Sequence, residues 1–182
     1  HLHVKHISNL QRLEENNHVW MDKFTIRNLE LFGSSNIGAI SLIDVLDFCT
    51  TPMGSRLLKR WLAFPLNKKH SIEDRHSVVQ WMIENEEPSS SLEKSVKDIG
   101  DLERIISKVA TARINPREVV HLKNALLSLV DVKEITASCS NAVINKIGNQ
   151  INLCESVRER IENEIQDDAP IALNKGSVIK AG

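Results

Sequence analysis

The chain has 182 residues, of which 41% are hydrophobic and 26% charged, with only seven Gly and five Pro. This composition is typical of a helix-rich globular protein and excludes a collagen-like or intrinsically disordered one. The 23 Lys and Arg residues face 24 Asp and Glu residues, so no overall positive field favours a stand-alone DNA-binding domain.

The N-terminal third is predicted to hold one short strand and two helices. Residues 18–22 are the best candidate for a β-strand. A capping-box pattern begins a helix over 41–49. A Thr-Pro pair, with Thr as the N-cap and Pro at the first helical position, begins another helix over 51–64.

The middle of the chain is predicted to be helical throughout. One helix begins near Ser71 and ends in a Glu-rich break at 84–88. Two further helices cover 92–110, with Gly100 as the joint between them. The run Asn115-Pro116-Arg117-Glu118 combines an N-cap, a Pro and a back-bonding Glu, and it therefore begins another helix.

The C-terminal part is predicted to contain one long helix over about 150–165, followed by an extended end over 171–179. The expected fold is therefore mainly all-α, with five or six helices, a minor strand near the N-terminus and an extended C-terminal end.

The three cysteines, Cys49, Cys139 and Cys154, lie far apart in apolar stretches that indicate core positions. This spacing argues against a disulfide framework and for a reducing, cytoplasmic setting. No apolar run approaches the ~18 residues that span a bilayer, so no membrane association is expected. The chain begins at His1 and ends at Gly182 without a closing helix, so we expect a segment of a longer protein.

No catalytic, cofactor or metal site is predicted. The glycines never form a phosphate cradle, and the patterns of serine hydrolases, zinc proteases and structural zinc sites are absent. The His1-x-His3-x-x-His6 pattern is better explained as a solvated terminal segment than as a metal site. Asp101, Glu103 and Arg104 are explained more simply by structural ion pairs than by acid–base catalysis.

Positive charge gathers between residues 56 and 69, where there are five basic residues and no acid. This bias fits contact with a phosphate backbone or with an acidic neighbouring domain, but a solvated helix face is the more ordinary explanation. Between residues 155 and 168 the bias reverses, with six acids and two basic residues, which would repel DNA. The basic residues are Arg56, Lys59, Arg60, Lys68 and Lys69.

Three blocks, at 21–31, 51–75 and 99–118, together with the stretch 176–182, form one family pattern. Its main positions are Asp22, Thr25, Asn28, Leu29, Glu30, Thr51, Pro52, Gly54, Arg56, Leu58, Trp61, Pro65, Asp101, Leu102, Glu103, Arg104 and Pro116. The pattern resembles the core domain, or lever, of the MutS mismatch-repair proteins.

The resemblance implies that residues 1–182 are the first segment of that helical domain, without the clamp, ATPase and mismatch-recognition domains. The segment is then not an enzyme, whereas the parent is a DNA-dependent ATPase that uses ATP and Mg. The implied partners are mismatched duplex DNA through other domains, a MutS-like dimer partner and a MutL-like downstream protein. The implied location is the cytoplasm, associated with the nucleoid.

Two alternatives remain open at this point. One is a self-contained helical module for protein interaction. The other is a weak DNA-backbone-binding module that uses Lys59, Arg60, Lys68 and Lys69. We also expect Trp61 and Trp81 to fill the core and Gly54 to permit a close backbone approach. Apolar faces that lack their covering segment are expected to be exposed.

Overall fold

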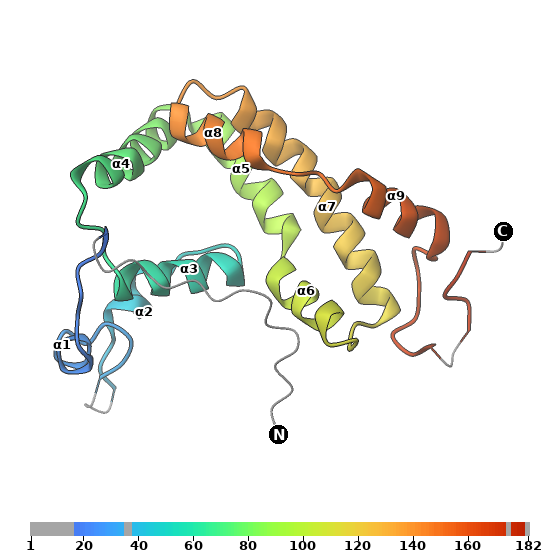
Figure 1. The fold of residues 1–182 in the computed structure, drawn as a ribbon, viewed down its shortest axis with the longest axis horizontal. Coiled ribbons are helices and arrows are strands. Elements are labelled where there is room, and N and C mark those ends of the chain that lie inside the picture. The colour runs from blue at the N-terminus through green and yellow to red at the C-terminus, as the bar shows by residue number, and fades with distance from the viewer. Residues whose placement is uncertain (1–16, 35–37, 174–175, 181–182) are drawn as a thin grey trace.

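The computed structural model describes residues 17–34, 38–173 and 176–180, and this part of the chain is helical. In Figure 1 an N-terminal unit, containing α1 to α3, lies at one side, and α4 leads from it to a body formed by α5 to α9. The helices are α1 (Lys23–Asn28), α2 (Leu42–Leu46), α3 (Pro52–Ala63), α4 (Lys69–Glu84), α5 (Glu86–Ile99), α6 (Leu102–Ala110), α7 (Pro116–Ala137), α8 (Ala142–Gln150) and α9 (Glu155–Glu164). The mainly all-α prediction is confirmed.

Side-chain caps begin three helices where the sequence predicts them. The Ser41 amide donates to Asp44 Oδ2 at 3.1 Å at the start of α2. Thr51 Oγ1 accepts from the amide of Gly54 at 3.1 Å and begins α3. At α7, Asn115 and the Glu118 side chain satisfy each other's backbone amides, which completes a capping box.

The prediction of a strand over 18–22 is wrong. In the described part of the chain this segment makes an isolated antiparallel bridge between His18 and Leu66, supported by the Val19 amide donating to the Pro65 carbonyl at 2.8 Å. A two-residue contact cannot form a ladder, so the segment stays irregular. The extended C-terminal end predicted over 171–179 is confirmed only near Ile179, which forms a second isolated bridge with Ile165. It is wrong over 171–173, which form bends and a 3-10 turn, and at Ser177, whose φ is +52°.

Several predicted helix limits are wrong. The helix α4 begins at Lys69 rather than Ser71, and the break after it is a single residue, Asn85. Helix α5 starts at Glu86 and includes Pro88, because the first turn of a helix has no intrahelical partner for the amide that proline lacks. Gly100 ends α5 with a φ of +69°, as its predicted role as a joint requires.

Helix α8 was not predicted, and the last helix begins at Glu155 instead of residue 150. The sequence of α8 contains two Asn and one Gly, which have low helix propensity. Its position depends on packing: a Cβ at Gly148 would lie 2.3 Å from Thr136 Oγ1 on α7. Only glycine allows this close approach of α8 to α7.

The core lies between α5 and α7, where Leu92, Ile99, Ala125 and Val132 form a buried cluster. Helix α7 also contacts α6, α8 and α9, so it is the central element of the body. The predicted core position of Cys139 is confirmed, whereas Cys49 is exposed and Cys154 is only partly buried. All three cysteines are free.

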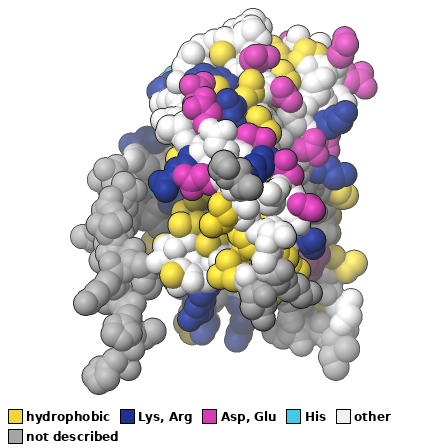
Figure 2. Space-filling view, turned by 90° about the vertical axis from the view of Figure 1, so that its right-hand side faces the viewer, with side chains coloured by type: hydrophobic (Ala, Val, Ile, Leu, Met, Phe, Trp, Pro, Cys, Tyr) yellow, Lys and Arg dark blue, Asp and Glu magenta, His cyan; other side chains and the backbone are white. Residues whose placement is uncertain are grey.

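Large apolar side chains remain exposed on two parts of the molecule. In the N-terminal unit, Phe48 is 88%, Trp20 72% and Phe24 69% exposed. Figure 2 views the face near α9 and the C-terminal end, where hydrophobic side chains are exposed below an area of mixed acidic and basic ones. The expected exposed apolar faces are therefore present. Among the described residues, no helix is long and apolar enough to cross a membrane.

Candidate functional site

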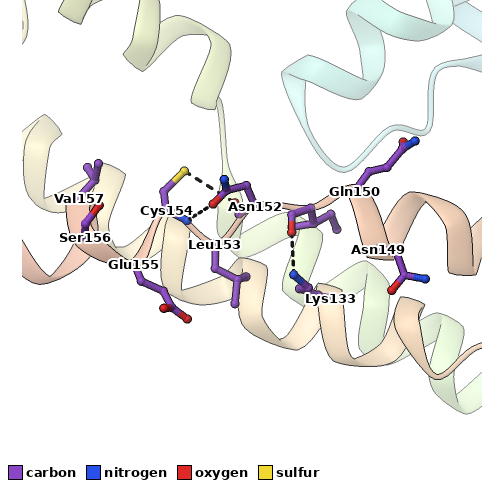
Figure 3. Close-up of a pocket in the computed structure, with 10 residues that line it drawn as sticks. Lys133, Asn149, Gln150, Asn152, Leu153, Cys154, Glu155, Ser156 and Val157 are labelled. Carbon is purple, nitrogen blue, oxygen red and sulfur yellow. Dashed lines mark hydrogen bonds between the residues drawn. The ribbon is translucent and has the colours of Figure 1, made fainter.

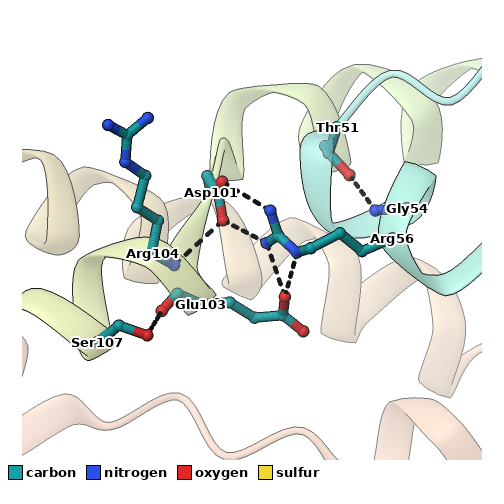
Figure 4. Close-up of polar contacts among 7 residues, drawn as sticks. All are labelled: Thr51, Gly54, Arg56, Asp101, Glu103, Arg104 and Ser107. Carbon is teal, nitrogen blue, oxygen red and sulfur yellow. Dashed lines mark hydrogen bonds and ion pairs between the residues drawn. The ribbon is translucent and has the colours of Figure 1, made fainter.

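The guanidinium of Arg56 on α3 contacts two carboxylates at the start of α6. Its Nη1 and Nη2 donate to Asp101 at 3.1 and 2.6 Å, and its Nε donates to Glu103 Oε2 at 2.8 Å. Figure 4 shows the three side chains converging between the two helices. The forked contact with Asp101 is the strongest common geometry for an ion pair. We call this group, Arg56, Asp101 and Glu103, the Arg56 junction.

Asp101 has two roles in the junction. Its side chain also accepts from the Arg104 amide at 3.2 Å and so caps α6. The hydrogen bond from Arg56 is the main reason that the pKa of Asp101 lies below its ordinary value, and the bond from the Arg104 amide adds to it. The same contacts raise the pKa of Arg56, first through Asp101 and then through Glu103. The structural ion-pair interpretation of Asp101 and Glu103 is confirmed, with Arg56 as their partner.

The junction fixes one corner of a closed frame of helices. Helices α3, α4 and α5 follow one another in the chain and form three sides of this frame (Figure 1), and Arg56 joins the start of α3 to the end of α5 at the Gly100–Asp101 turn. Met53, one turn earlier on α3, packs against the α5–α7 core cluster. The N-terminal unit is therefore held to the body by one ion-pair group and one apolar anchor at this corner.

The other end of α3 is braced by Trp61. The Arg75 guanidinium on α4 lies 3.6 Å from the centre of the Trp61 ring, a cation–π contact across the α3–α4 corner. Trp61 remains 41% exposed, so its prediction as a core filler is wrong. Trp81 is partly buried and donates from Nε1 to Ser140 Oγ at 3.1 Å, which ties α4 to the α7–α8 turn.

Gly54 allows a close approach, but of a side chain rather than a backbone segment. A Cβ at this position would lie 3.2 Å from Cys49 Cβ and 3.3 Å from Thr51 Oγ1. Thr51 and Gly54 are drawn beside Arg56 in Figure 4. The glycine thus lets the loop before α3 fold tightly against the first turn that carries Met53 and Arg56.

Acids of the same chain surround part of the predicted basic stretch. Arg56 belongs to the junction, and Lys69 pairs with Glu73 at 3.5 Å. Lys59 lies near Asp47, whose pKa is lowered mainly by the Ser55 hydroxyl and further by this lysine. Arg60 and Lys68 make no ion pair among the described residues. A continuous basic surface over 56–69 is therefore reduced to a few separated charges.

The first family block lies in the N-terminal unit, away from the junction. Asp22 caps α1 by accepting from the Thr25 amide at 2.6 Å. Glu30 adopts a left-handed conformation with φ of 49°, and its carbonyl accepts from the Leu42 amide at 3.0 Å. This contact joins the end of the block to α2. Of the family positions, the structure therefore brings Arg56, Asp101 and Glu103 together. The family positions between 22 and 30 make their contacts within the N-terminal unit and do not take part in the junction.

Sequence reasoning missed an ion cluster around Lys123. This lysine is buried on α7, with 8% of its side chain exposed, and donates to Glu162 at 2.6 Å and Asp167 at 2.5 Å. Lys180 donates to the Glu162 carbonyl at 2.7 Å. The acidic stretch 155–168 is thus partly neutralised within the chain. The signal that was available was a lysine between apolar positions of a predicted amphipathic helix.

The α8–α9 connection borders an open groove of about 760 Å³ (Figure 3). Lys133 Nζ donates to the Ile151 carbonyl at 2.9 Å, and Asn152 accepts from the Cys154 amide at 2.9 Å. Cys154 is held in a left-handed conformation with φ of 48°. These polar groups support the turn, so we assign the groove no ligand.

In the described ranges, no group of three or more His, Cys, Asp and Glu residues converges as a metal site would require. The His1, His3 and His6 pattern lies outside the described residues. The sequence also has no glycine-rich phosphate loop, so the residues present do not fit an ATP–Mg site. The polar groups described above connect one helix to another.

Comparison with known proteins gives a consistent family match. MutS domain III matches residues 24–181. The chain is 50% identical over all 182 residues to the DNA mismatch repair protein MutS of Bacteroides fragilis and 49% identical to that of Bacteroides thetaiotaomicron. It is 46% identical to the corresponding protein of Christiangramia forsetii. In each case the chain spans 21% of the length of the relative.

Proposed function

The chain belongs to the MutS domain III family, and on that premise we propose that it is a non-catalytic lever segment of a DNA mismatch-repair protein. In this role it couples mismatched-DNA binding and clamp closure to the ATPase of the longer protein. Residues 1–182 would form the first segment of the lever domain, with the clamp, ATPase and mismatch-recognition domains elsewhere in the parent.

The observation that carries this proposal is the Arg56 junction. A lever has to transmit displacement from one end to the other, and packed helices move as rigid bodies between discrete arrangements. The junction joins the N-terminal unit to the α5–α7 core through charged side chains, close to the apolar contact of Met53. A movement of either part is then passed to the other through this corner of the frame.

The remaining parts of the proposal rest on family membership. The parent would bind ATP and Mg, act on mismatched duplex DNA as a dimer and pass the signal to a MutL-like protein. It would do so in the cytoplasm, associated with the nucleoid. The Arg56 junction itself is assigned no contact with these ligands and partners.

The test uses the full-length protein that carries this segment. Arg56→Gln should leave mismatched-duplex binding within about twofold, since recognition lies elsewhere. The change in ATP hydrolysis caused by mismatched DNA should fall by about fivefold or more, the lower range of a typical coupling. Lys94→Gln on α5 removes one exposed charge and serves as the matched control. Normal coupling in the Arg56→Gln protein would contradict the proposal.

The exposed aromatic side chains of the N-terminal unit favour a second candidate, a self-contained helical module for protein interaction. Trp20, Phe24 and Phe48 are the residues that such a module would offer to a partner. The two candidate functions predict different sequences downstream of this chain in the full reading frame. A Gly-x-x-x-x-Gly-Lys-Ser/Thr motif a few hundred residues downstream supports the lever segment and removes the module.

A further inference from the structure

Helix α6 and the turn that joins it to α7 carry a second group of positive charges, separate from the basic stretch at 56–69. Four basic residues and no acid occur from residue 104 to residue 117. They lie on α6, in the turn and in the first turn of α7. We call the surface along α6, the turn after it and the start of α7 the α6–α7 tip. Arg104 lies in the first turn of α6, Arg113 in the turn and Arg117 in the first turn of α7, and Lys108 on α6 is the fourth basic residue.

Three of the four charges are available to a ligand. Arg104, Arg113 and Arg117 are exposed, and none of their guanidinium groups makes an ion pair in the described part of the chain. In Figure 4 the Arg104 side chain points away from the Arg56 junction. Lys108 differs, because it crosses to α7 and pairs with Glu118.

The tip is held in shape by contacts that do not use the arginine guanidinium groups, although the charge of Arg104 also acts on Asp101 and Glu118. The Lys108–Glu118 pair joins α6 to α7, and the Arg113 amide donates to the Lys108 carbonyl at 2.8 Å. Ala112 completes the turn in a left-handed conformation with φ of 52°. The capping box at the start of α7 fixes the following turn. Because the backbone of the turn is already ordered, binding of a ligand costs little backbone conformational entropy.

Most acids near the tip are neutralised within the chain. Arg56 holds Asp101 and Glu103, and Lys108 holds Glu118. The exception is Asp98, which makes no ion pair among the described residues. It borders the open groove, about 380 Å³ in volume, between α6 and α7 that Arg104 also lines. Asp98 should weaken the binding of any anion beside Arg104.

We propose that the α6–α7 tip binds the phosphodiester backbone of duplex DNA without reading its sequence. Planar guanidinium groups match the geometry of phosphate oxygens. The segment 102–118 contains no aromatic residue, so it has neither a platform for base stacking nor the aromatic anchor common in protein interfaces. This contact is additional to the lever role and does not depend on it.

The test measures binding of the 182-residue chain to a matched 30-base-pair duplex across a salt series starting near ~50 mM. The triple variant Arg104→Gln, Arg113→Gln, Arg117→Gln should bind about tenfold more weakly at low salt. The slope of log affinity against log salt should fall by about 2 to 3, as expected for three lost phosphate contacts. Asp98→Asn should tighten binding and leave the slope unchanged.

The matched control removes three exposed lysines outside the tip, with Lys23→Gln, Lys94→Gln and Lys146→Gln, and circular dichroism confirms that each variant is folded. The proposal is overturned if the slope decreases equally in the control and in the triple variant, or if the unaltered chain does not bind the duplex at low salt. It is also overturned if poly-glutamate binds the tip as tightly as DNA does, since the surface would then fit an acidic protein.

Discussion

Arg56 Nη2 lies 2.6 Å from Asp101 Oδ1, although 45 residues separate the two in the chain. Asp101 also caps α6, so one carboxylate sets both where α6 begins and where α3 is held. Half of the Arg56 side chain is exposed, and solvent therefore competes for the contact. The pair is thus suited to holding two helices in register and less suited to adding stability.

The first prediction concerns Arg56→Gln in the isolated chain. Loss of the Arg56–Asp101 ion pair should leave the midpoint of thermal unfolding of the α5–α7 body nearly unchanged, because this ion pair is exposed. The N-terminal unit should become less fixed in orientation, and small-angle X-ray scattering should show a larger radius of gyration. Arg60→Gln, also on α3 but unpaired, is the control. Equal scattering from both variants would exclude a positional role for Arg56.

The second prediction concerns acid. The pKa of Asp101 is lowered below its ordinary value of 3.8, chiefly by the hydrogen bond from Arg56, and the pKa of Glu118 is lowered below 4.5, chiefly by Lys108. Both carboxyls bind fewer protons when the chain is folded, so their stabilising contribution is complete above about pH 4.5 and is lost as the pH falls through the folded values.

Urea unfolding measured across this acid range checks the assignment. Asp101→Asn should lower the dependence of the unfolding free energy on pH, since one of the groups that takes up a proton is removed. Asp98→Asn is the control, because Asp98 has no ion-pair partner in the described structure. A pH dependence for Asp101→Asn equal to that of the unaltered chain would be incompatible with an Arg56-held carboxylate.

The third prediction concerns Lys123→Met, which keeps the length of the side chain but removes its charge. Glu162 and Asp167 would lose their buried partner, and the free energy of unfolding should fall by about 1.5 to 3 kcal/mol, the range for hydrogen bonds to charged groups. Lys180→Gln should have a smaller effect, because Lys180 lies farther from both carboxylates. Chemical denaturation compares the two, and a larger loss for Lys180→Gln would contradict the central role of Lys123.

The fourth prediction concerns Gly148→Ala. The added Cβ would lie 2.3 Å from Thr136 Oγ1 and 2.8 Å from the Ala137 nitrogen, so α8 would have to move away from α7. Overpacking of this kind costs about 1 to 3 kcal/mol. Gly33→Ala is the control, since a Cβ there meets no atom within 4 Å. Denaturation midpoints that fall equally for both variants would show that the α7–α8 contact is not tight.

The fifth prediction concerns the exposed aromatic side chains. At high concentration the chain should self-associate through the N-terminal unit, because isolated apolar surface of this kind is unfavourable in water. Phe24→Ser with Phe48→Ser should reduce the weight-average mass in sedimentation experiments. Val157→Ser on α9 is the control for a general loss of apolar surface. Association that depends only on Val157 would place the contact on the other face.

Local signals in the sequence predict the helix starts but not the contacts between helices. Thr51 and Asn115 each cap a helix by accepting from an amide three residues away, so a short window contains the whole interaction. The position of α8 depends instead on Gly148 meeting Thr136, and no window around α8 contains that information. The same holds for the site, because Arg56 and Asp101 are identifiable as family positions while their pairing depends on the fold.

The frame of α3, α4 and α5 has two corners made of continuous polypeptide and one made of side chains. Residues 64–68 join α3 to α4, and Asn85 joins α4 to α5. If Arg56 and Met53 lose their contacts, the Trp61–Arg75 contact still braces the α3–α4 corner, and the Trp81–Ser140 hydrogen bond still ties α4 to the α7–α8 turn. Loss of the third corner would therefore loosen the orientation of α3 against the body while α4 stays attached to it, and a cross-link between α3 and the Gly100–Asp101 turn would restore that orientation.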